Sequence, residues 1–233
     1  MLKNFQIKPP FFEVGPKAYL YGEGMLKLAK VIDKTAMKYD VDVIVTPQYT
    51  DISLLAQNTE RILVFAQHMD SLEVGRGLGS VLPEAVKAAG AVGVMLNHAE
   101  KPITMEEVEK TIKRADEVGL ATIVCANTVE DVKAIAKMSP NLIVAEPTDL
   151  IGTGQTSDSN YVIETIKTVR EINPDIMVLQ GAGISNGQDV YNTIKLGAQA
   201  TGTTSGIMKS ETPYDMVEEM LYNLRKAWDE CNA

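Results

Sequence analysis

A single carboxylate stands at the end of an apolar run, shortly before a glycine-rich turn. Residues 142–146 read Leu-Ile-Val-Ala-Glu, and a Gly-Thr-Gly turn follows at residues 152–154. A buried strand here would carry Glu146 to its carboxyl end, and the bare backbone N–H groups of the turn could bind an anion. A loop with this composition can also move. The segment therefore predicts proton transfer on a phosphorylated substrate.

Two further titratable side chains follow apolar runs in the same way. Lys17 comes after residues 11–15, and His98 comes after residues 93–97. Together with Glu146 they form a plausible acid/base set. Each also has a structural interpretation. Lys17 could be a surface lysine, His98 a core histidine bonded to backbone, and Glu146 a salt-bridge partner of Lys101 or Arg76.

The runs that carry these side chains alternate with amphipathic stretches. Eight short apolar runs predict strands, and their lack of polar alternation is typical of parallel strands covered by helices. They are Phe11 to Gly15, Val41 to Thr46, Leu63 to Ala66, Gly93 to Asn97, Ala121 to Cys125, Leu142 to Glu146, Met177 to Ala182 and Ala200 to Thr204.

The stretches between them carry helix signals. Residues 104–118 begin with Thr104 and Glu107 at capping-box spacing. One apolar stripe marks the last helix and predicts core packing; it consists of Met216, Val217, Met220, Leu221, Leu224 and Trp228.

Eight strand–helix units in 233 residues predict a (β/α)8 barrel, an α/β fold. An open doubly wound sheet is the rival, but a dinucleotide-binding sheet of that kind should carry G-x-G-x-x-G after its first strand, where this chain has Gly15-Pro16-Lys17. Because no linker-like segment interrupts the chain, we expect one domain over residues 1–233. Barrel enzymes act at the carboxyl ends of their strands, where Lys17, His98 and Glu146 would meet.

Composition restricts the partners. The net charge of −9 disfavours nucleic acid and anionic membranes. No run of 18 apolar residues occurs, and residues 1–6 lack the apolar region of a signal peptide, so we expect a cytoplasmic protein. Cys125 and Cys231 are too few and too differently placed to predict a disulfide framework or a metal site. No cofactor is expected.

Several segments, in order along nearly the whole chain, together resemble triosephosphate isomerase, notably its short archaeal-type form. They are residues 16–19, 65–70, 75–79, 96–101, 145–147, 151–154, 181–185 and 204–206. The combination of Asn-His-x-Glu with Glu-Pro-x-x-x-Ile-Gly-Thr-Gly is specific to that family. The resemblance implies a (β/α)8 barrel that interconverts glyceraldehyde 3-phosphate and dihydroxyacetone phosphate, a role in glycolysis and gluconeogenesis, and a phosphorylated sugar as substrate.

The resemblance also implies residue roles. Glu146 would be the base that removes the proton next to the carbonyl, His98 the electrophile and Lys17 the cation beside the enediolate; this family is itself the standard example of a glutamate base paired with a neutral imidazole. Asn97 and Glu100 would support the site without touching substrate. Closure of residues 147–157 would exclude water. The substrate-binding residues would be Gly15, Ile151, Gly152, Gly183, Thr204 and Ser205.

The chain departs from the family at two places. Gly15-Pro16-Lys17 replaces the usual Asn-x-Lys, so an amide that touches the substrate is missing. Ala99 and Lys101 replace a serine and an arginine beside Glu100, which removes a hydroxyl and a bidentate fork. These changes could mark an isomerase of a longer ketose phosphate that uses extra space near the first strand.

Three other functions are alternatives to the interconversion of these triose phosphates. Isomerisation of a tetrose or pentose phosphate uses the same chemistry. A catalytically silent sugar-phosphate sensor should have lost Glu146 or His98, and it has lost neither. A Schiff-base aldolase needs a desolvated lysine inside the barrel, whereas the strand ends offer only Lys17 and Lys101.

His68 lies in a loop region that resembles the family's subunit contact. We therefore expect it to have a structural or interface role rather than a catalytic one. The resemblance implies a homodimer or homotetramer.

Overall fold

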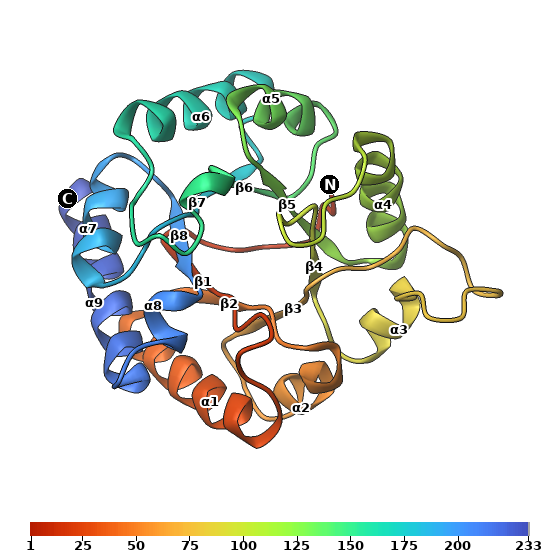
Figure 1. Ribbon diagram of the computed structural model, residues 1–233, viewed down its shortest axis with the longest axis horizontal. Helices are drawn as coiled ribbons and strands as arrows, with labels where there is room; N and C mark the ends of the chain where they lie inside the picture. Colours follow the sequence, from red (N-terminus) through yellow and green to blue (C-terminus); the bar gives the residue numbers. More distant parts are fainter. Residues whose placement is uncertain (233) are drawn as a thin grey trace.

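Eight parallel strands close into a barrel in chain order, with helices around the ring (Figure 1). The computed structural model describes residues 1–232. The strands are β1 Phe11–Val14, β2 Asp42–Val45, β3 Leu63–Ala66, β4 Gly93–Leu96, β5 Ala121–Ala126, β6 Leu142–Ala145, β7 Met177–Gln180 and β8 Ala200–Thr203. The predicted (β/α)8 barrel is confirmed, and each predicted strand is present, with ends that differ by at most two residues.

The longer helices are α1 Gly22–Tyr39, α4 Met105–Val118, α5 Val129–Lys137, α6 Ser159–Ile172, α7 Gly187–Lys195 and α9 Pro213–Asn232. Shorter ones are α2 Ile52–Ala56, α3 Pro83–Ala88 and α8 Ser205–Met208, with 3-10 turns at Tyr49–Asp51 and Thr148–Leu150. The apolar stripe of α9 packs as predicted: Val217, Met220, Leu221 and Leu224 are buried, and Met216 and Trp228 lie against the core.

Two apolar layers hold the barrel, because successive side chains of a strand point to opposite faces. One layer fills the space between strands and helices. The other fills the barrel interior with residues such as Phe11, Ile44 and Phe65, and Phe5 and Ile7 of the amino-terminal segment pack against it. Since this inner layer is dense, only polar and small residues near the carboxyl ends of the strands leave room for a site.

The amino-terminal end of α4 shows how far the predicted capping box forms. The Thr104 side chain accepts a hydrogen bond from the backbone N–H of Glu107 at 3.2 Å, as predicted. The Glu107 carboxylate, however, accepts from Ser71 instead of closing the capping box. The complete box lies at α5, between Thr128 and Asp131. The predicted capping bond of Thr104 is therefore confirmed, whereas the reciprocal bond of Glu107 is not formed because Ser71 binds that carboxylate.

The loop between β3 and α3 extends away from the barrel, as the yellow segment of Figure 1 shows. Its base is held by Asp70, whose carboxylate accepts the backbone N–H of Val81 at 2.6 Å and lies 3.2 Å from Nε2 of buried His68. Its apolar tip residues Val74 and Leu78 are exposed. Within residues 1–232, we find no helix with the length and apolar character needed to cross a membrane.

Candidate active site

One large cavity of about 690 Å³ opens among the carboxyl ends of the strands. Lys17 after β1, His98 after β4 and Glu146 after β6 all line it. The fold thus brings together three side chains that lie far apart along the chain. Six residues predicted to bind substrate line the same cavity, namely Gly15, Ile151, Gly152, Gly183, Thr204 and Ser205.

Glu146 lies against the turn that follows β7. Its Oε1 accepts the backbone N–H of Ala182 at 2.9 Å. A Cβ on Gly181 would lie 3.0 Å from Cβ and Cδ of Glu146, so any side chain there would crowd the glutamate. Burial raises the pKa of Glu146, and the Ala182 bond and Lys17 oppose that rise only partly. A carboxylate poised in this way is a stronger base than one in water. Among the described residues it forms no ion pair, so Lys101 and Arg76 are not its partners.

His98 is held in a defined tautomer. Its Nδ1 accepts the backbone N–H of Glu100 at 3.1 Å, so a neutral ring must carry its proton on Nε2. Burial, and then the charge of Lys17, lower the pKa of His98, and Glu100 opposes them. The neutral imidazole therefore offers one N–H donor to the cavity it lines. The backbone bond predicted for a core histidine is present, but it orients the ring and does not exclude it from the cavity.

Lys17 is fixed at both its charged end and its backbone. Its Nζ donates to Glu100 Oε1 at 2.6 Å, and the Lys17 bond lowers the pKa of Glu100. The Lys17 backbone has a φ of +48°, which a non-glycine residue rarely adopts. Amide groups of Gln48 and Gln67 donate to the Lys17 carbonyl at 2.7 and 3.0 Å. These two bonds from neighbouring loops stabilise the strained backbone.

Asn97 supports the site from outside the cavity. Its side-chain amide donates to the Cys125 carbonyl at 3.0 Å, and its Oδ1 accepts the backbone N–H of Ile103 at 3.1 Å. These bonds tie the loop after β4 to β5 and to the start of α4. Asn97 itself has a φ of +57°, so the polypeptide turns sharply just before His98.

The predicted lid, residues 147–157, lies over the turn after β7. A Cβ on Gly183 would lie 1.9 Å from the Gln155 carbonyl oxygen and 2.6 Å from the Thr156 nitrogen, so the two backbones touch. Gly183, Gly152 and Gly154 have φ values of +71°, +74° and +76°. The resemblance implies that Gly183 binds phosphate; in the structure its backbone also lies against the backbone of the lid.

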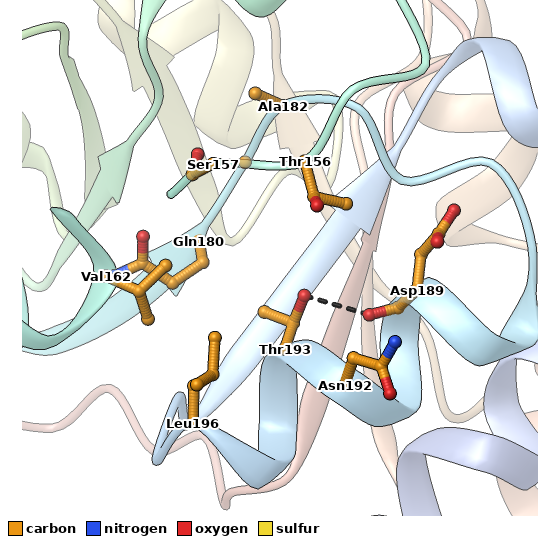
Figure 2. A pocket seen from close by; sticks show the side chains of 10 residues that line it. Thr156, Ser157, Val162, Gln180, Ala182, Asp189, Asn192, Thr193 and Leu196 are labelled. Carbon is orange, nitrogen blue, oxygen red and sulfur yellow. Dashed lines mark hydrogen bonds between the residues drawn. The ribbon is translucent and has the colours of Figure 1, made fainter. Parts of the chain in front are cut away.

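A second, smaller cavity of about 50 Å³ lies behind the end of the lid (Figure 2). Thr156 and Ser157 of the lid line it together with Gln180 of β7 and Asp189 of α7. Ser157 Oγ and Gln180 Oε1 are buried without a hydrogen-bond partner among residues 1–232. The volume suits one ordered water or slightly more. The carboxyl-terminal end of the lid thus lies over a small cavity of mixed lining, in which Val162 and Leu196 accompany the polar side chains.

Two side-chain oxygen atoms lie close to Gly15. A Cβ at Gly15 would lie 3.0 Å from Glu13 Oε1 and 3.3 Å from Thr204 Oγ1. Glu13 is buried, with 9% of its surface exposed, and it lines the cavity. The extra room near the first strand stays a prediction, since Glu13 narrows the wall beside Gly15 while both residues line the same open cavity.

Sequence reasoning missed three polar residues of the site: Glu13, Gln48 and Gln67. Glu13 is a charged residue inside the apolar run Phe-Phe-Glu-Val, and that interruption was a usable signal. Gln48 and Gln67 follow β2 and β3, at the edge where the other site residues lie. His68 also lines the cavity, beside Gln67, while its Nε2 faces Asp70. Within residues 1–232 no group of three His, Cys, Asp or Glu side chains could hold a metal ion.

Known proteins resemble this chain in sequence and fold. A family model described as triosephosphate isomerase matches residues 16–220. Triosephosphate isomerase of Sulfurisphaera tokodaii is 39% identical over 227 residues, which cover 96% of this chain and 99% of that protein. The enzyme of Methanobacterium bryantii is 41% identical over 202 residues, 84% of this chain and 89% of the other. The crystal structure of triosephosphate isomerase from Bartonella henselae shares the fold, with a TM-score of 0.75, 15% identity and coverage of 96% of this chain and 100% of that one.

Proposed function

The chain belongs to the triosephosphate isomerase family, and we propose that Glu146, His98 and Lys17 are its catalytic residues. It is an isomerase that interconverts glyceraldehyde 3-phosphate and dihydroxyacetone phosphate, the triose phosphates of glycolysis. One observation above all supports the assignment: a carboxylate of raised pKa and a neutral imidazole with a fixed tautomer line one cavity together with a lysine.

In the proposed mechanism, Glu146 removes a proton from the carbon next to the carbonyl and returns it to the neighbouring carbon. A carbon acid of this kind is far too weak for a carboxylate unless the enediolate is stabilised. The Nε2–H of His98 donates to the oxygen that gains charge. Lys17, held by Glu100, supplies positive charge beside it. Lid closure keeps water from the enediolate intermediate. It also hinders the intermediate from eliminating its phosphate group.

The phosphate is proposed to bind between the lid and the loops after β7 and β8. Gly183, Thr204 and Ser205 line that side of the cavity, and Thr204 and Ser205 stand at the start of the short helix α8. Barrels of this class often bind phosphate at this place, on backbone N–H groups. Gly152 of the lid would contact the phosphate from the remaining side. Gly15 is proposed to contact substrate through its backbone.

A substrate panel tests this assignment. Ketose phosphates of three, four and five carbons are assayed with the unmodified chain and with Glu146→Asp. We expect the three-carbon substrate to give the highest kcat/KM. Glu146→Asp should lower that value at least about a hundredfold, because withdrawing a base by about 1 Å can cost that much.

The matched control is Glu130→Asp, which shortens an exposed carboxylate in the first turn of α5 by the same methylene and should leave kcat/KM unchanged. A clear preference for four carbons would contradict the triose substrate. Full activity of Glu146→Asp would contradict the assigned base.

We further propose that the chain forms one domain over residues 1–233 and works in the cytoplasm as a homodimer or homotetramer, with no nucleic-acid or membrane partner. The extended loop between β3 and α3 supports association, because Val74 and Leu78 expose apolar surface at its tip. A second copy of the chain would bury that surface.

A further inference from the structure

Glu13 is a buried carboxyl group in the active-site cavity that the proposed proton transfer does not use. It belongs to β1, and its side chain points into the barrel, where it lines the same cavity as Glu146 and Lys17. Burying a carboxyl group inside a barrel lowers the stability of the fold unless the group has hydrogen-bond partners, and such residues are mostly exposed. Its neighbours show that space is kept for it.

Two glycines make room for this side chain. A Cβ on Gly202 of β8 would lie 2.9 Å from Glu13 Oε2, and one on Gly15 would lie 3.0 Å from Oε1. Because β1 pairs with β8 and places Glu13 opposite Gly202, the strand register fixes this arrangement. A side chain at residue 15 would therefore crowd this carboxyl group.

Only one oxygen of this carboxyl group is bonded. Thr46 Oγ1 donates to Oε1 at 3.0 Å. Within residues 1–232, no donor lies at hydrogen-bond distance from Oε2. Oε2 is not among the fully buried unpaired side-chain atoms, which agrees with its position at the wall of the cavity. One oxygen is thus anchored and the other is available to a ligand.

The charge state of Glu13 follows from its surroundings. Burial, and then the charge of Glu146, raise the pKa of Glu13 to about 8, while the Thr46 bond and Lys17 oppose the rise. Cys125 is the other titratable group that interacts with it, and burial raises the pKa of that thiol well above its usual value. At neutral pH Glu13 therefore carries its proton and can donate a hydrogen bond.

We propose that Glu13 is a substrate-contacting residue whose free carboxyl oxygen hydrogen-bonds a carbonyl or hydroxyl oxygen of the triose, in place of the side chain that Gly15 lacks. The contact would orient the carbon end of the substrate toward His98 and Glu146. This inference rests on the proposed function, because it concerns the same cavity and the same substrate. It makes Glu13 and Gly15 a coupled pair: a carboxyl group is present where residue 15 has no side chain.

A residue swap tests the coupling. The unmodified chain, Glu13→Ala, Gly15→Asn and the double variant Glu13→Ala/Gly15→Asn are assayed with glyceraldehyde 3-phosphate, after circular dichroism has shown that each is folded. Loss of one donor should lower kcat/KM of Glu13→Ala about tenfold to a hundredfold. Gly15→Asn should also lose activity, because the new Cβ meets the carboxyl group. The double variant should recover at least about threefold over Glu13→Ala, since the amide then fills the vacated space.

A pH profile is the second measurement, and it still decides if Glu13→Ala fails to fold. The kcat/KM of the unmodified chain should fall as pH rises through the Glu13 pKa of about 8, because the ionised group no longer donates and repels an anionic substrate. Glu13→Gln keeps the shape and a donor but cannot ionise, so this decline should be lost. The control is Asp33→Asn, a buried carboxylate outside the cavity that accepts backbone N–H groups of Glu60 and Ile62; it should keep the decline.

Two results would overturn the proposal. The first is full activity of Glu13→Ala. The second is an equal loss of kcat/KM in Glu13→Ala and in the double variant, together with an unchanged pH profile of Glu13→Gln. The second result would mean that Glu13 only supports the barrel. Glu146→Asp is assayed alongside. Full activity of that variant would refute the catalytic assignment itself, whatever the Glu13 variants do, so the two failures can be told apart.

Discussion

At the scale of single residues, the site depends on groups whose pKa values are shifted in opposite directions. Burial raises the pKa of the carboxyl groups Glu13 and Glu146 and lowers the pKa of His98. In each case the neutral form is favoured. The cavity is therefore an environment that penalises charge, which suits a base that must take up a proton and an imidazole that must stay uncharged.

This environment predicts a pH-dependent effect on stability. Because the folded-state pKa of Glu146 is raised, its stability contribution is complete below the ordinary pKa of 4.5 and is lost as pH rises through the folded-state pKa. Glu146→Gln, which cannot ionise, should therefore unfold at a higher temperature than the unmodified chain at pH 7.5.

Calorimetric scans at pH 4 and 7.5 measure this effect, and the difference in Tm should narrow at the lower pH. Glu164→Gln, an exposed change on α6, is the control and should show no such trend. A Glu146→Gln variant that is less stable than the unmodified chain at pH 7.5 would contradict the argument.

At the scale of elements, the turn after β7 holds two parts of the site at once. The Ala182 backbone N–H binds Glu146, and Gly183 meets the lid backbone at Gln155. Both residues have positive φ, +68° at Ala182 and +71° at Gly183. A strained turn is thus the point at which the base and the lid are placed relative to each other.

We predict that Gly183→Ala impairs catalysis by displacing the lid. The added Cβ would lie 1.9 Å from the Gln155 oxygen, so the lid backbone must move. We expect kcat/KM to fall at least about tenfold, as displaced loops commonly cause. Steady-state kinetics on the triose substrate measure the loss.

Gly197→Ala separates lid displacement from backbone strain. Gly197 has a φ of +95°, yet a Cβ there would meet no atom within 4 Å. That variant should lose about 1 kcal/mol of stability and keep its kcat/KM. Equal kinetic effects of the two substitutions would show that the contact between Gly183 and the lid is unimportant.

At the scale of the whole molecule, one loop extends away from the barrel. This loop lies between β3 and α3 (Figure 1), and its residues Val74 and Leu78 are exposed. Its base is anchored, because the Asp70 carboxylate accepts the Val81 backbone N–H and faces His68. A loop that is anchored at its base and exposes apolar side chains is well suited to contact a second copy of the chain.

We predict that the double variant Val74→Asp/Leu78→Asp dissociates the assembly. Light scattering should give a dimer or tetramer for the unmodified chain at micromolar concentration and a smaller species for the variant, because two charges cannot be buried cheaply in an interface. Ile163→Asp, at an exposed apolar residue of α6, is the control and should leave the mass unchanged. A monomeric unmodified chain would refute the prediction.

The sequence by itself determined the parts of this protein that local order encodes. Apolar runs, their spacing and the residues at their ends predicted eight strands, the barrel, and Lys17, His98 and Glu146 at one edge. These features depend on side-chain periodicity and on the type of residue after each strand, both of which are visible along the chain.

Only the tertiary structure decided which residues touch across strands. It set Glu13 between Gly15 and Gly202, brought the amides of Gln48 and Gln67 to the Lys17 carbonyl, and placed the Gln155 backbone against Gly183. These contacts join residues up to about 190 positions apart, and they depend on the closure and register of the barrel. No local pattern records that geometry, because a one-residue change in register would move every inward side chain to the other face.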